Sequence, residues 1–255
     1  MSTKILKEKD FHNQVFGGDN SAREAANEKF YSITESLIKF YREKLLSFSK
    51  NKQVLEYGCG LSSYSYLLAH EGSEFVRGID ISDVAVQKAN LKAEQEGLAH
   101  KMEFLVMDAE KLDFADNTFD LVCGNGILHH LDLHKSYKEL ARTIKPDGQA
   151  IFSEPLGHNP LINWYRNRTP NIRTEDEHPL MMADIQLATQ YFGKVEIRYF
   201  FLSTLALSPF RKLKFFRGMV AICDNLDKAL FSLLPFLKKH AWMVVLTMSE
   251  PKKAK

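Results

Sequence analysis

Short apolar runs that alternate with helix-like segments restrict the fold of this 255-residue chain more than any other feature of its sequence. The runs show little of the apolar–polar alternation of a half-exposed strand, and such runs are typical of strands buried on both faces of a parallel sheet. Their regular exchange with helical segments predicts a doubly wound α/β fold. Seven strands are expected, at residues 53–57, 75–81, 102–107, 119–123, 149–154, 195–201 and 242–248.

The segments between these runs predict helices and two longer connections. A helix over about residues 20–48 is expected before the first strand, because Ser21 and Glu24 form a capping-box pair and apolar residues recur on one helical face. Further helices are expected at 62–70, 82–97, 134–144 and 179–192, with a polar loop at 156–177 and a helical insertion at about 205–239.

Composition and charge exclude several classes of protein. A formal net charge of +2 gives no overall case for binding nucleic acid. Residues 1–10 lack the apolar core of a signal peptide, and no apolar run reaches the length that spans a bilayer. Cys59, Cys123 and Cys223 lie far apart, without the spacing of a zinc or redox motif, and free thiols are typical of a reducing compartment. We therefore expect a soluble, cytoplasmic protein that binds no nucleic acid.

Residues with the chemistry of a nucleotide site follow four of the expected strands. Gly58-Cys59-Gly60 ends the first strand, where glycines allow a sharp turn and the close approach of a ligand. Asp80 ends the second strand, 20 positions beyond Gly60, where an acid can accept hydrogen bonds from both hydroxyls of a ribose. Asp108 and Asn125 follow the third and fourth strands. Because open α/β sheets bind ligands at the carboxyl ends of their strands, these residues predict one adenosine-binding cleft.

The stretch that holds these residues resembles class I S-adenosylmethionine-dependent methyltransferases, in particular the menaquinone/ubiquinone-type and methyltransferase type 11 group. VLEYGCG at 54–60 is similar to the first motif of that family, and GIDIS at 78–82 is similar to its ribose-binding motif. Segments 107–131 and 144–155 are similar to the later motifs. The resemblance covers about residues 50–155 and is weak before and after them, in the parts that select the substrate in this family.

The resemblance implies a Rossmann-like, doubly wound sheet of seven strands, mostly parallel with an antiparallel last strand. It also implies a single methyltransferase domain, with an N-terminal helical cap at 1–49, a cofactor-binding core at 50–155, and a substrate loop, helical insertion and final strands at 156–255. The cofactor would be S-adenosyl-L-methionine, converted to S-adenosyl-L-homocysteine, with Glu56 at the acidic position associated with the methionine ammonium. The expected cofactor-binding residues are Glu56, Tyr57, Gly58, Cys59, Gly60, Asp80, Ile81, Asp108, Ala109 and Asn125.

Three other functions share parts of this pattern. A nicotinamide dehydrogenase would need a third glycine at position 63, where the chain has Ser63. A nucleic-acid methyltransferase is disfavoured because Gly126-Ile127-Leu128, and no NPPY-type motif, follows Asn125. A non-catalytic module that binds the nucleoside stays open, because transfer depends on groups outside the motifs. The preferred prediction is methyl transfer to an O, N or C atom of a small, partly apolar molecule.

Candidates for catalysis lie beyond the fourth and fifth strands. A hydroxyl or protonated amine acceptor needs a base, and His158 is the first candidate because histidine titrates near neutral pH. His130 is the second, with an alternative role in orienting the cofactor loop, and Glu154 could bind an amine or hold a neighbouring loop. No zinc or magnesium constellation is evident, so no metal is expected. The expected substrate-binding residues are His12, Tyr31, His129 and Tyr165, of which the two tyrosine rings could equally belong to the core.

The insertion at 205–239 allows two interpretations. Apolar residues between Met219 and Leu234 form a helical stripe, and residues 210–217 interleave basic and aromatic side chains. We favour a lid helix packed over the sheet, since single amphipathic stretches usually belong to the core. The alternative is a hydrophobic substrate tunnel or loose contact with an anionic membrane surface. The oligomeric state does not follow from the sequence.

Overall fold

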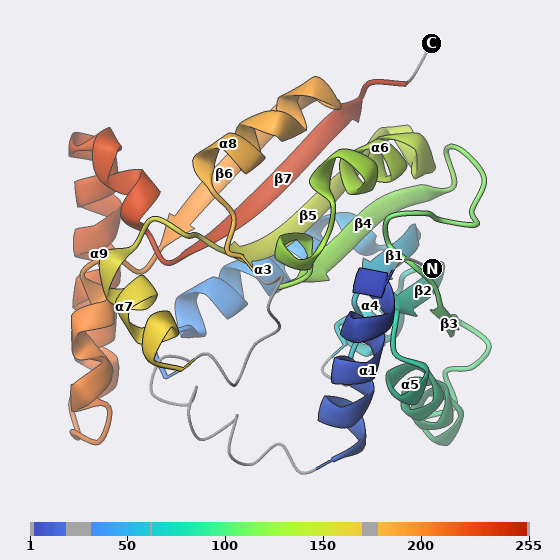
Figure 1. Cartoon of the computed structure of the whole chain (residues 1–255), viewed down its shortest axis with the longest axis horizontal. Helices are drawn as coiled ribbons and strands as arrows, with labels where there is room; N and C mark the ends of the chain where they lie inside the picture. Colours follow the sequence, from blue (N-terminus) through green and yellow to red (C-terminus); the bar gives the residue numbers. More distant parts are fainter. Residues whose placement is uncertain (1–2, 19–31, 62, 170–177, 254–255) are drawn as a thin grey trace.

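The computed structural model describes residues 3–18, 32–61, 63–169 and 178–253 of the chain. A sheet with the strand order β3-β2-β1-β4-β5-β7-β6 runs through its centre (Figure 1). β7 pairs antiparallel with both β5 and β6, and the other strand pairs are parallel. This confirms the mostly parallel, Rossmann-like sheet with an antiparallel last strand. The strands are β1 (Gln53–Tyr57), β2 (Phe75–Asp80), β3 (Met102–Val106), β4 (Phe119–Asn125), β5 (Ile144–Pro155), β6 (Phe192–Phe200) and β7 (Met243–Pro251).

Helices cover both faces of the sheet. The expected helices at 82–97 and 134–144 are present within one or two residues, and the one expected at 62–70 is described from Ser65. The helices of the described residues are α1 (Thr3–Gly17), α3 (Glu35–Ser49), α4 (Ser65–His70), α5 (Asp83–Gln95), α6 (Leu133–Thr143), α7 (Pro160–Arg168), α8 (Met182–Leu187) and α9 (Phe216–Leu233), with 3₁₀ turns η1 (Leu128–His130), η3 (Ala188–Gln190), η4 (Thr204–Phe210) and η5 (Pro235–His240).

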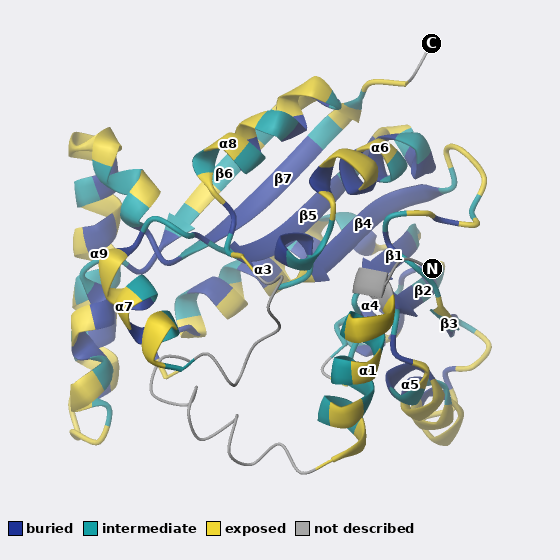
Figure 2. Ribbon diagram, in the orientation of Figure 1, coloured by how far each residue is buried: buried dark blue, intermediate teal, exposed yellow. Residues whose placement is uncertain are grey.

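Neighbouring residues of one strand face different helical layers. Val54 of β1 belongs to the apolar cluster that includes residues of α3, α4 and α5. Leu55, the next residue, belongs to the cluster on the other face, with residues of α6 and α8. Because successive side chains of a strand point to opposite faces, a strand between two such layers is apolar throughout. Figure 2 shows β4, β5 and β7 as largely buried, which explains the continuous apolar runs of the sequence.

Helix α7 occupies part of the segment that was expected to be a polar loop at 156–177, so that expectation was wrong for residues 160–168. The side chain of Asn159 caps the helix by accepting hydrogen bonds from the backbone N–H groups of Leu161 (3.0 Å) and Ile162 (3.2 Å). Pro160 stands in the first turn, where its fixed φ favours a helix start. The polar composition of residues 156–177 suggested a loop, although Asn159 followed by Pro160 is typical of the start of a helix.

The N-terminal cap is helical, but its first helix, α1, was not expected from the sequence. The helix expected at 20–48 is described from residue 35 as α3, and the capping pair Ser21 and Glu24 lies outside the described residues. Tyr41 fastens α3 to the sheet, because its buried hydroxyl donates to the carbonyl of Gly124 (2.9 Å) and accepts from the Gly124 N–H (3.1 Å). The cap thus rests on the end of β4.

The insertion before the last strand is helical, as expected, and consists of η4, α9 and η5. Helix α9 packs against η4, η5 and β6. It stands at the end of the molecule opposite to α1 and α5 (Figure 1). Within the described residues, no helix combines the length and the apolar character needed to cross a membrane.

Candidate cofactor and methyl-transfer site

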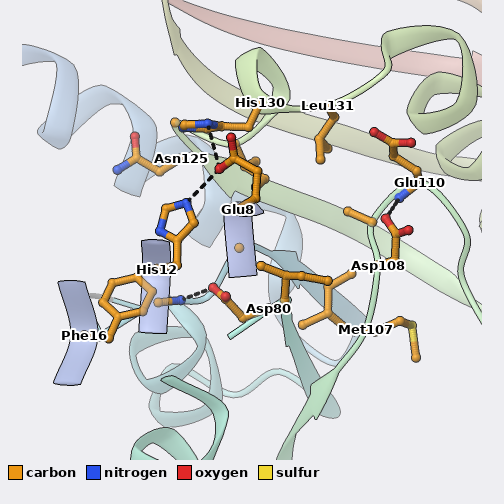
Figure 3. Close-up of a pocket in the computed structure, with 17 residues that line it drawn as sticks. Glu8, His12, Phe16, Asp80, Met107, Asp108, Glu110, Asn125, His130 and Leu131 are labelled. Atoms are coloured by element: carbon orange, nitrogen blue, oxygen red, sulfur yellow. Dashed lines mark hydrogen bonds and ion pairs between the residues drawn. The ribbon is translucent and has the colours of Figure 1, made fainter. Parts of the chain in front are cut away.

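A cavity lies at the carboxyl ends of β1, β2, β3 and β4, beneath helix α1 (Figure 3). Its volume is about 210 Å³. A single water needs only roughly 10–15 Å³, so the cavity has room for a much larger molecule. The strand ends that were expected to form one cleft therefore converge. The cavity is lined by Glu8, His12, Phe16, Gly58, Gly60, Ile79, Asp80, Ile81, Met107, Asp108, Ala109, Glu110, Asn125, Gly126, Ile127, His130 and Leu131.

The turn after β1 needs its glycines for both conformation and space. Gly58 and Gly60 have φ of +63° and +45°, in the left-handed region that favours glycine. A Cβ on Gly58 would lie 3.0 Å from the side chain of Ile127, and one on Gly60 would lie 3.4 Å from the ring of Phe16. The turn therefore presents bare backbone to the cavity, as a closely approaching ligand requires.

Asp80 places a carboxylate at the floor of the cavity. Its Oδ2 accepts a hydrogen bond from the Gly60 N–H and its Oδ1 accepts one from the Ser82 N–H, both at 2.9 Å. Each carboxylate oxygen can accept two hydrogen bonds, so both keep capacity for a ligand. Burial raises the pKa of Asp80, although these hydrogen bonds act in the opposite direction. The Asp80 carboxylate is held in place by these hydrogen bonds and lies beside the Gly58–Gly60 turn. This arrangement fits the hydroxyl groups of a nucleoside's ribose.

The ends of β3 and β4 supply the remaining expected cofactor residues. Asp108 lines the cavity, and its Oδ1 accepts a hydrogen bond from the backbone N–H of Glu110 at 2.8 Å, which orients the carboxylate. Ala109 and Ile81 line the cavity between Asp108 and Asp80, and the exposed Asn125 lines it at the end of β4. These positions agree with an adenosine that extends across the strand ends.

Glu56 does not line the cavity. It is buried, and its Oε1 accepts a hydrogen bond from the backbone N–H of Tyr64 (2.8 Å). Its Oε2 accepts from the N–H (3.0 Å) and hydroxyl (2.5 Å) of Ser65 and from the hydroxyl of Ser63. The carboxylate thus holds the start of α4, where N–H groups lack helical partners. The expected contact of Glu56 with a methionine ammonium finds no support in these contacts.

Tyr57 and Cys59 also lie behind the cavity lining. The Tyr57 ring is fully buried and packs edge-on against Phe152, with ring centroids 5.8 Å apart. Cys59 contributes its backbone, because its N–H donates to the carbonyl of Ile79 at 3.0 Å and so fixes the glycine turn against β2. Burial raises the pKa of the Cys59 thiol well above its usual value, which keeps the thiol neutral and unreactive. Both residues shape the site from the core.

Helix α1 covers the cavity with one stripe of side chains, Glu8, His12 and Phe16, spaced four residues apart. Two contacts hold the helix to the start of α5. The Asn13 amide oxygen accepts from the Ser82 hydroxyl (2.5 Å) while its nitrogen donates to Asp83 (2.8 Å). The sequence analysis expected His12 to reach the site from the N-terminal cap, and the structure places it there. The spacing of Glu8, His12 and Phe16 was the signal that could have revealed the helix.

Glu8, His12 and His130 form a cluster at the upper wall of the cavity (Figure 3). Glu8 Oε2 lies 3.5 Å from Nε2 of His12 and 3.8 Å from Nδ1 of His130. One ligand-type atom from each side chain lies within 4.8 Å of the others, so the three could hold a metal ion. The sequence showed no such constellation because α1 and η1 are far apart along the chain. Glu8 was not among the expected site residues, and neither were other residues of the cavity lining such as Phe16 and Met107.

Glu154 and His129 pair with each other away from the cavity. Glu154 is fully buried, and its Oε1 accepts from the backbone N–H groups of Ile127 (2.9 Å) and Leu128 (2.8 Å). Its Oε2 lies 2.7 Å from Nδ1 of His129. All its contacts serve to hold η1, and so the second of the two roles considered for Glu154 is the observed one. Neither side chain belongs to the lining of the cofactor cavity.

The remaining predicted site residues do not join the cavity. His158 lies after β5, where its Nε2 accepts from the Met182 N–H (3.2 Å) and its carbonyl contacts Nδ1 of His240 (3.0 Å). His158 is therefore outside the lining of the cofactor cavity, because the chain turns into α7 and toward α8, and its role as the base stays a prediction. Tyr165 is a residue of α7, is 8% exposed and packs in the core. Tyr31 lies outside the described residues.

Fold and site together define a Rossmann-like domain built to bind an adenosine-containing molecule at its strand ends. Residues 55–152 match the methyltransferase domain family described as methyltransferase type 11. A sterol 24-C-methyltransferase of Aspergillus fumigatus is 32% identical over 176 residues, which are 69% of this chain and 44% of that protein. A tocopherol O-methyltransferase of Arabidopsis thaliana is 40% identical over 126 residues, 46% of this chain and 36% of that protein. The chain thus spans less than half of the length of these two relatives.

A solved structure extends the similarity of fold to the whole chain. The geranyl diphosphate C-methyltransferase of Streptomyces coelicolor, in complex with Mg²⁺, geranyl diphosphate and S-adenosyl-L-homocysteine, has a TM-score of 0.65 over 98% of both chains at 12% identity. The chain therefore contains, at residues 55–152, a methyltransferase domain of the class I S-adenosylmethionine-dependent kind.

Proposed function

We propose that this chain transfers the methyl group of S-adenosylmethionine to an O, N or C atom of a small, partly apolar acceptor. The observation that carries this proposal is that the nucleoside-type strand ends and the Glu8–His12–His130 cluster line one cavity. Sterols and tocopherols, the molecules named in the two relatives, are largely apolar and support the choice of acceptor. Apolar cavity walls that suit such a molecule come from Ile79, Ile81, Met107, Ile127 and Leu131.

In this proposal the strand ends hold the cofactor. Asp80 accepts hydrogen bonds from the ribose hydroxyls, and the backbone of the Gly58–Gly60 turn passes next to the methionine part. Asp108 would accept a hydrogen bond from the adenine, and Asn125 would contact the cofactor at the end of β4. S-adenosylmethionine supplies a methyl group that its sulfonium already makes electrophilic. The chain then contributes mainly position, and alignment of two reactants is worth on the order of 7 kcal/mol.

A hydroxyl or amine acceptor also loses a proton, which we assign to the Glu8–His12–His130 cluster. Either imidazole can take the proton, and the Glu8 carboxylate, 3.5 and 3.8 Å from the two rings, stabilises the resulting positive charge. We assign no part of this step to His158 or Glu154, because neither lines the cavity. His130 therefore remains a candidate base, and His12 and Glu8 join it.

We also propose that the chain acts as one domain, in which 1–49 cap the site, 50–155 bind the cofactor and 156–255 complete the sheet and contact the acceptor or its source. A formal net charge of +2 supports a small-molecule acceptor and no nucleic-acid partner. Cys59, Cys123 and Cys223 are free thiols, which supports a reducing compartment such as the cytoplasm.

The test is a methyl-transfer assay on the purified chain, with methyl-labelled S-adenosylmethionine and a panel of apolar hydroxyl and amine acceptors. We expect turnover by the wild type. Loss of a general base typically costs on the order of 100-fold in kcat, so the double variant His12→Ala/His130→Ala should fall by that amount while its cofactor affinity changes little. His100→Ala is the matched control, because His100 is exposed and lies outside the cavity lining.

Four outcomes would change the assignment. Unchanged activity of His12→Ala/His130→Ala would show that neither imidazole is the base, and a parallel loss of cofactor affinity would assign the cluster to cofactor binding. Activity that a chelator abolishes and Zn²⁺ restores would place a metal ion among Glu8, His12 and His130. Tight cofactor binding without turnover on any acceptor would favour the non-catalytic module.

A further inference from the structure

Helix α9 buries one narrow face and leaves a second apolar face exposed. The buried face consists of Phe216, Val220, Asp227 and Phe231. On the other side of the helix, Phe215, Ile222, Leu226 and Leu233 are 80%, 70%, 47% and 78% exposed. Their spacing of seven, four and seven residues puts them on one stripe, which extends about 27 Å along the helix at 1.5 Å per residue. A single exposed apolar residue needs no explanation, but a continuous stripe of this length does.

Apolar side chains continue beyond both ends of the helix. Before it, Phe210 and Leu213 are 48% and 53% exposed, and after it Leu234 and Phe236 are 40% and 65% exposed. Helix α9 contributes no residue to the lining of the cofactor cavity, so the stripe does not face that cavity. Among the residues that the structure describes, nothing is packed on it. We call Phe215, Ile222, Leu226 and Leu233, with these flanking residues, the α9 surface.

Basic side chains flank this surface at both ends. Lys212, Lys214 and Arg217 are exposed at the start of α9, and Lys239 is exposed after its end. No ion pair with another described residue neutralises any of these four cations.

The acidic residues of the same segment point inward. Asp224 and Asp227 are the only acids between residues 203 and 241. The Asp227 carboxylate accepts hydrogen bonds from the backbone N–H groups of Leu202 and Ser203, both at 2.8 Å. Asp224 contacts the Thr204 hydroxyl at 3.3 Å. The outward charge of the segment is therefore entirely positive.

We propose that the α9 surface docks on the surface of an anionic phospholipid bilayer. An amphipathic helix that lies in the interface buries an apolar face among the acyl chains and places Lys and Arg near anionic headgroups. The apolar stripe and the cations at both of its ends meet these two requirements. A two-fold contact between copies of the chain would bring the cations of one copy against those of the other, which disfavours a dimer through this face. Docking would bring the protein to apolar acceptors, a consequence that rests on the proposed function.

The test measures co-sedimentation of the full chain with two kinds of vesicle, phosphatidylcholine alone and phosphatidylcholine with about a third of phosphatidylglycerol. We expect binding to the anionic vesicles only, and a loss of about tenfold or more at high salt, where charges are screened. Ile222→Glu/Leu233→Glu and Lys212→Glu/Lys214→Glu should each weaken binding by at least about tenfold. Leu91→Glu, at an apolar residue of α5 that is 54% exposed, is the matched control and should bind like the wild type.

No cofactor or acceptor is needed for this measurement, so its failure is distinct from a failure of the proposed function. Calorimetric titration with S-adenosylhomocysteine checks that each variant keeps its fold and its cofactor site. Absence of wild-type binding to anionic vesicles would overturn the proposal, as would equal binding by Ile222→Glu/Leu233→Glu. Wild-type dimers in light scattering that this variant converts to monomers would also overturn it, because the surface would then contact a second copy.

Discussion

Asp80 and Glu56 are both buried carboxylates, and burial raises the pKa of each. They stand at the ends of neighbouring strands, yet only Asp80 faces the cavity. The difference lies in their hydrogen bonds. Donors at the start of α4 surround Glu56, whereas Asp80 accepts from backbone N–H groups and also lines the cavity. Glu56 therefore stabilises the turn, and Asp80 is available to a ligand.

The raised pKa of Asp80 predicts that cofactor affinity falls as the pH decreases below neutral, and that the fall begins at a higher pH than for an exposed aspartate. The folded pKa lies above 3.8, so protonation begins at a higher pH than in an exposed aspartate and removes an acceptor of the ribose hydroxyls. Calorimetry across this pH range measures the effect. The ligand is S-adenosylhomocysteine, which carries no sulfonium charge. Constant affinity of the wild type for this ligand would contradict the prediction.

Single residues show where inference from the sequence succeeds and where it stops. Asp80 was predictable because a strand end and its distance from Gly60 fix both its place and its chemistry. Glu154 also ends a strand, but its role depends on N–H groups at residues 127 and 128 that turn toward it only in the folded chain. His158 follows the same strand and is carried away from the cavity by α7. Strand-end position was predictable, whereas side-chain direction was not.

At the scale of single elements, α1 closes the cofactor cavity and α5 holds α1. Asn13 bonds to both Ser82 and Asp83 at the start of α5, and Lys9 lies 3.2 Å from Asp83. The Asn13 and Lys9 side chains lower the pKa of Asp83, which keeps this carboxylate charged. Lys88 of α5 also donates to the carbonyl of Phe16 at 2.7 Å, so polar contacts with α5 fix the position of α1.

Asn13→Ala should loosen α1 without unfolding the protein. The substitution removes two hydrogen bonds, each worth about 1 kcal/mol, so we expect cofactor affinity to fall by about threefold to tenfold through faster dissociation. Stopped-flow release of S-adenosylhomocysteine and thermal melting check both parts. Gln14→Ala is the control, because Gln14 is exposed on the same helix. Equal release rates for Asn13→Ala and the wild type would show that the Asn13 hydrogen bonds do not hold α1 over the cavity.

The η1 turn depends on Glu154, and Glu154→Ala should therefore destabilise the fold. It leaves two buried N–H groups and the His129 ring without their partner, at a cost of about 2–4 kcal/mol. Urea unfolding measures this change. Glu196→Ala, which removes an exposed carboxylate of β6, should change the free energy of unfolding by less than about 0.5 kcal/mol. A similar small effect of Glu154→Ala would contradict the structural role assigned to this residue.

At the scale of the whole molecule, the strands of the sheet were predictable from the sequence, whereas the helices α1 and α7 that lie over it were not. Strands buried on both faces leave continuous apolar runs, and all seven were expected within a few residues except that β5 begins earlier, at Ile144. The covering helices α1 and α7 have largely polar sequences, because each buries only a small part of its surface. The direction of the exposed stripe of α9 also depends on tertiary packing. The pattern of apolar residues therefore predicts the buried strands, but it does not predict the helices that lie over them.

The central claim is that the strand-end cavity binds S-adenosylmethionine through Asp80. The most direct measurement is calorimetric titration of the wild type, Asp80→Asn and the exposed control Asp147→Asn with S-adenosylmethionine and S-adenosylhomocysteine. The account predicts micromolar binding by the wild type and the control, and a loss of at least about tenfold in Asp80→Asn, since a hydrogen bond to a charged acceptor is worth about 1.5–3 kcal/mol. Folded wild-type protein that binds neither molecule, or an Asp80→Asn variant that binds them as tightly as the wild type, would contradict it.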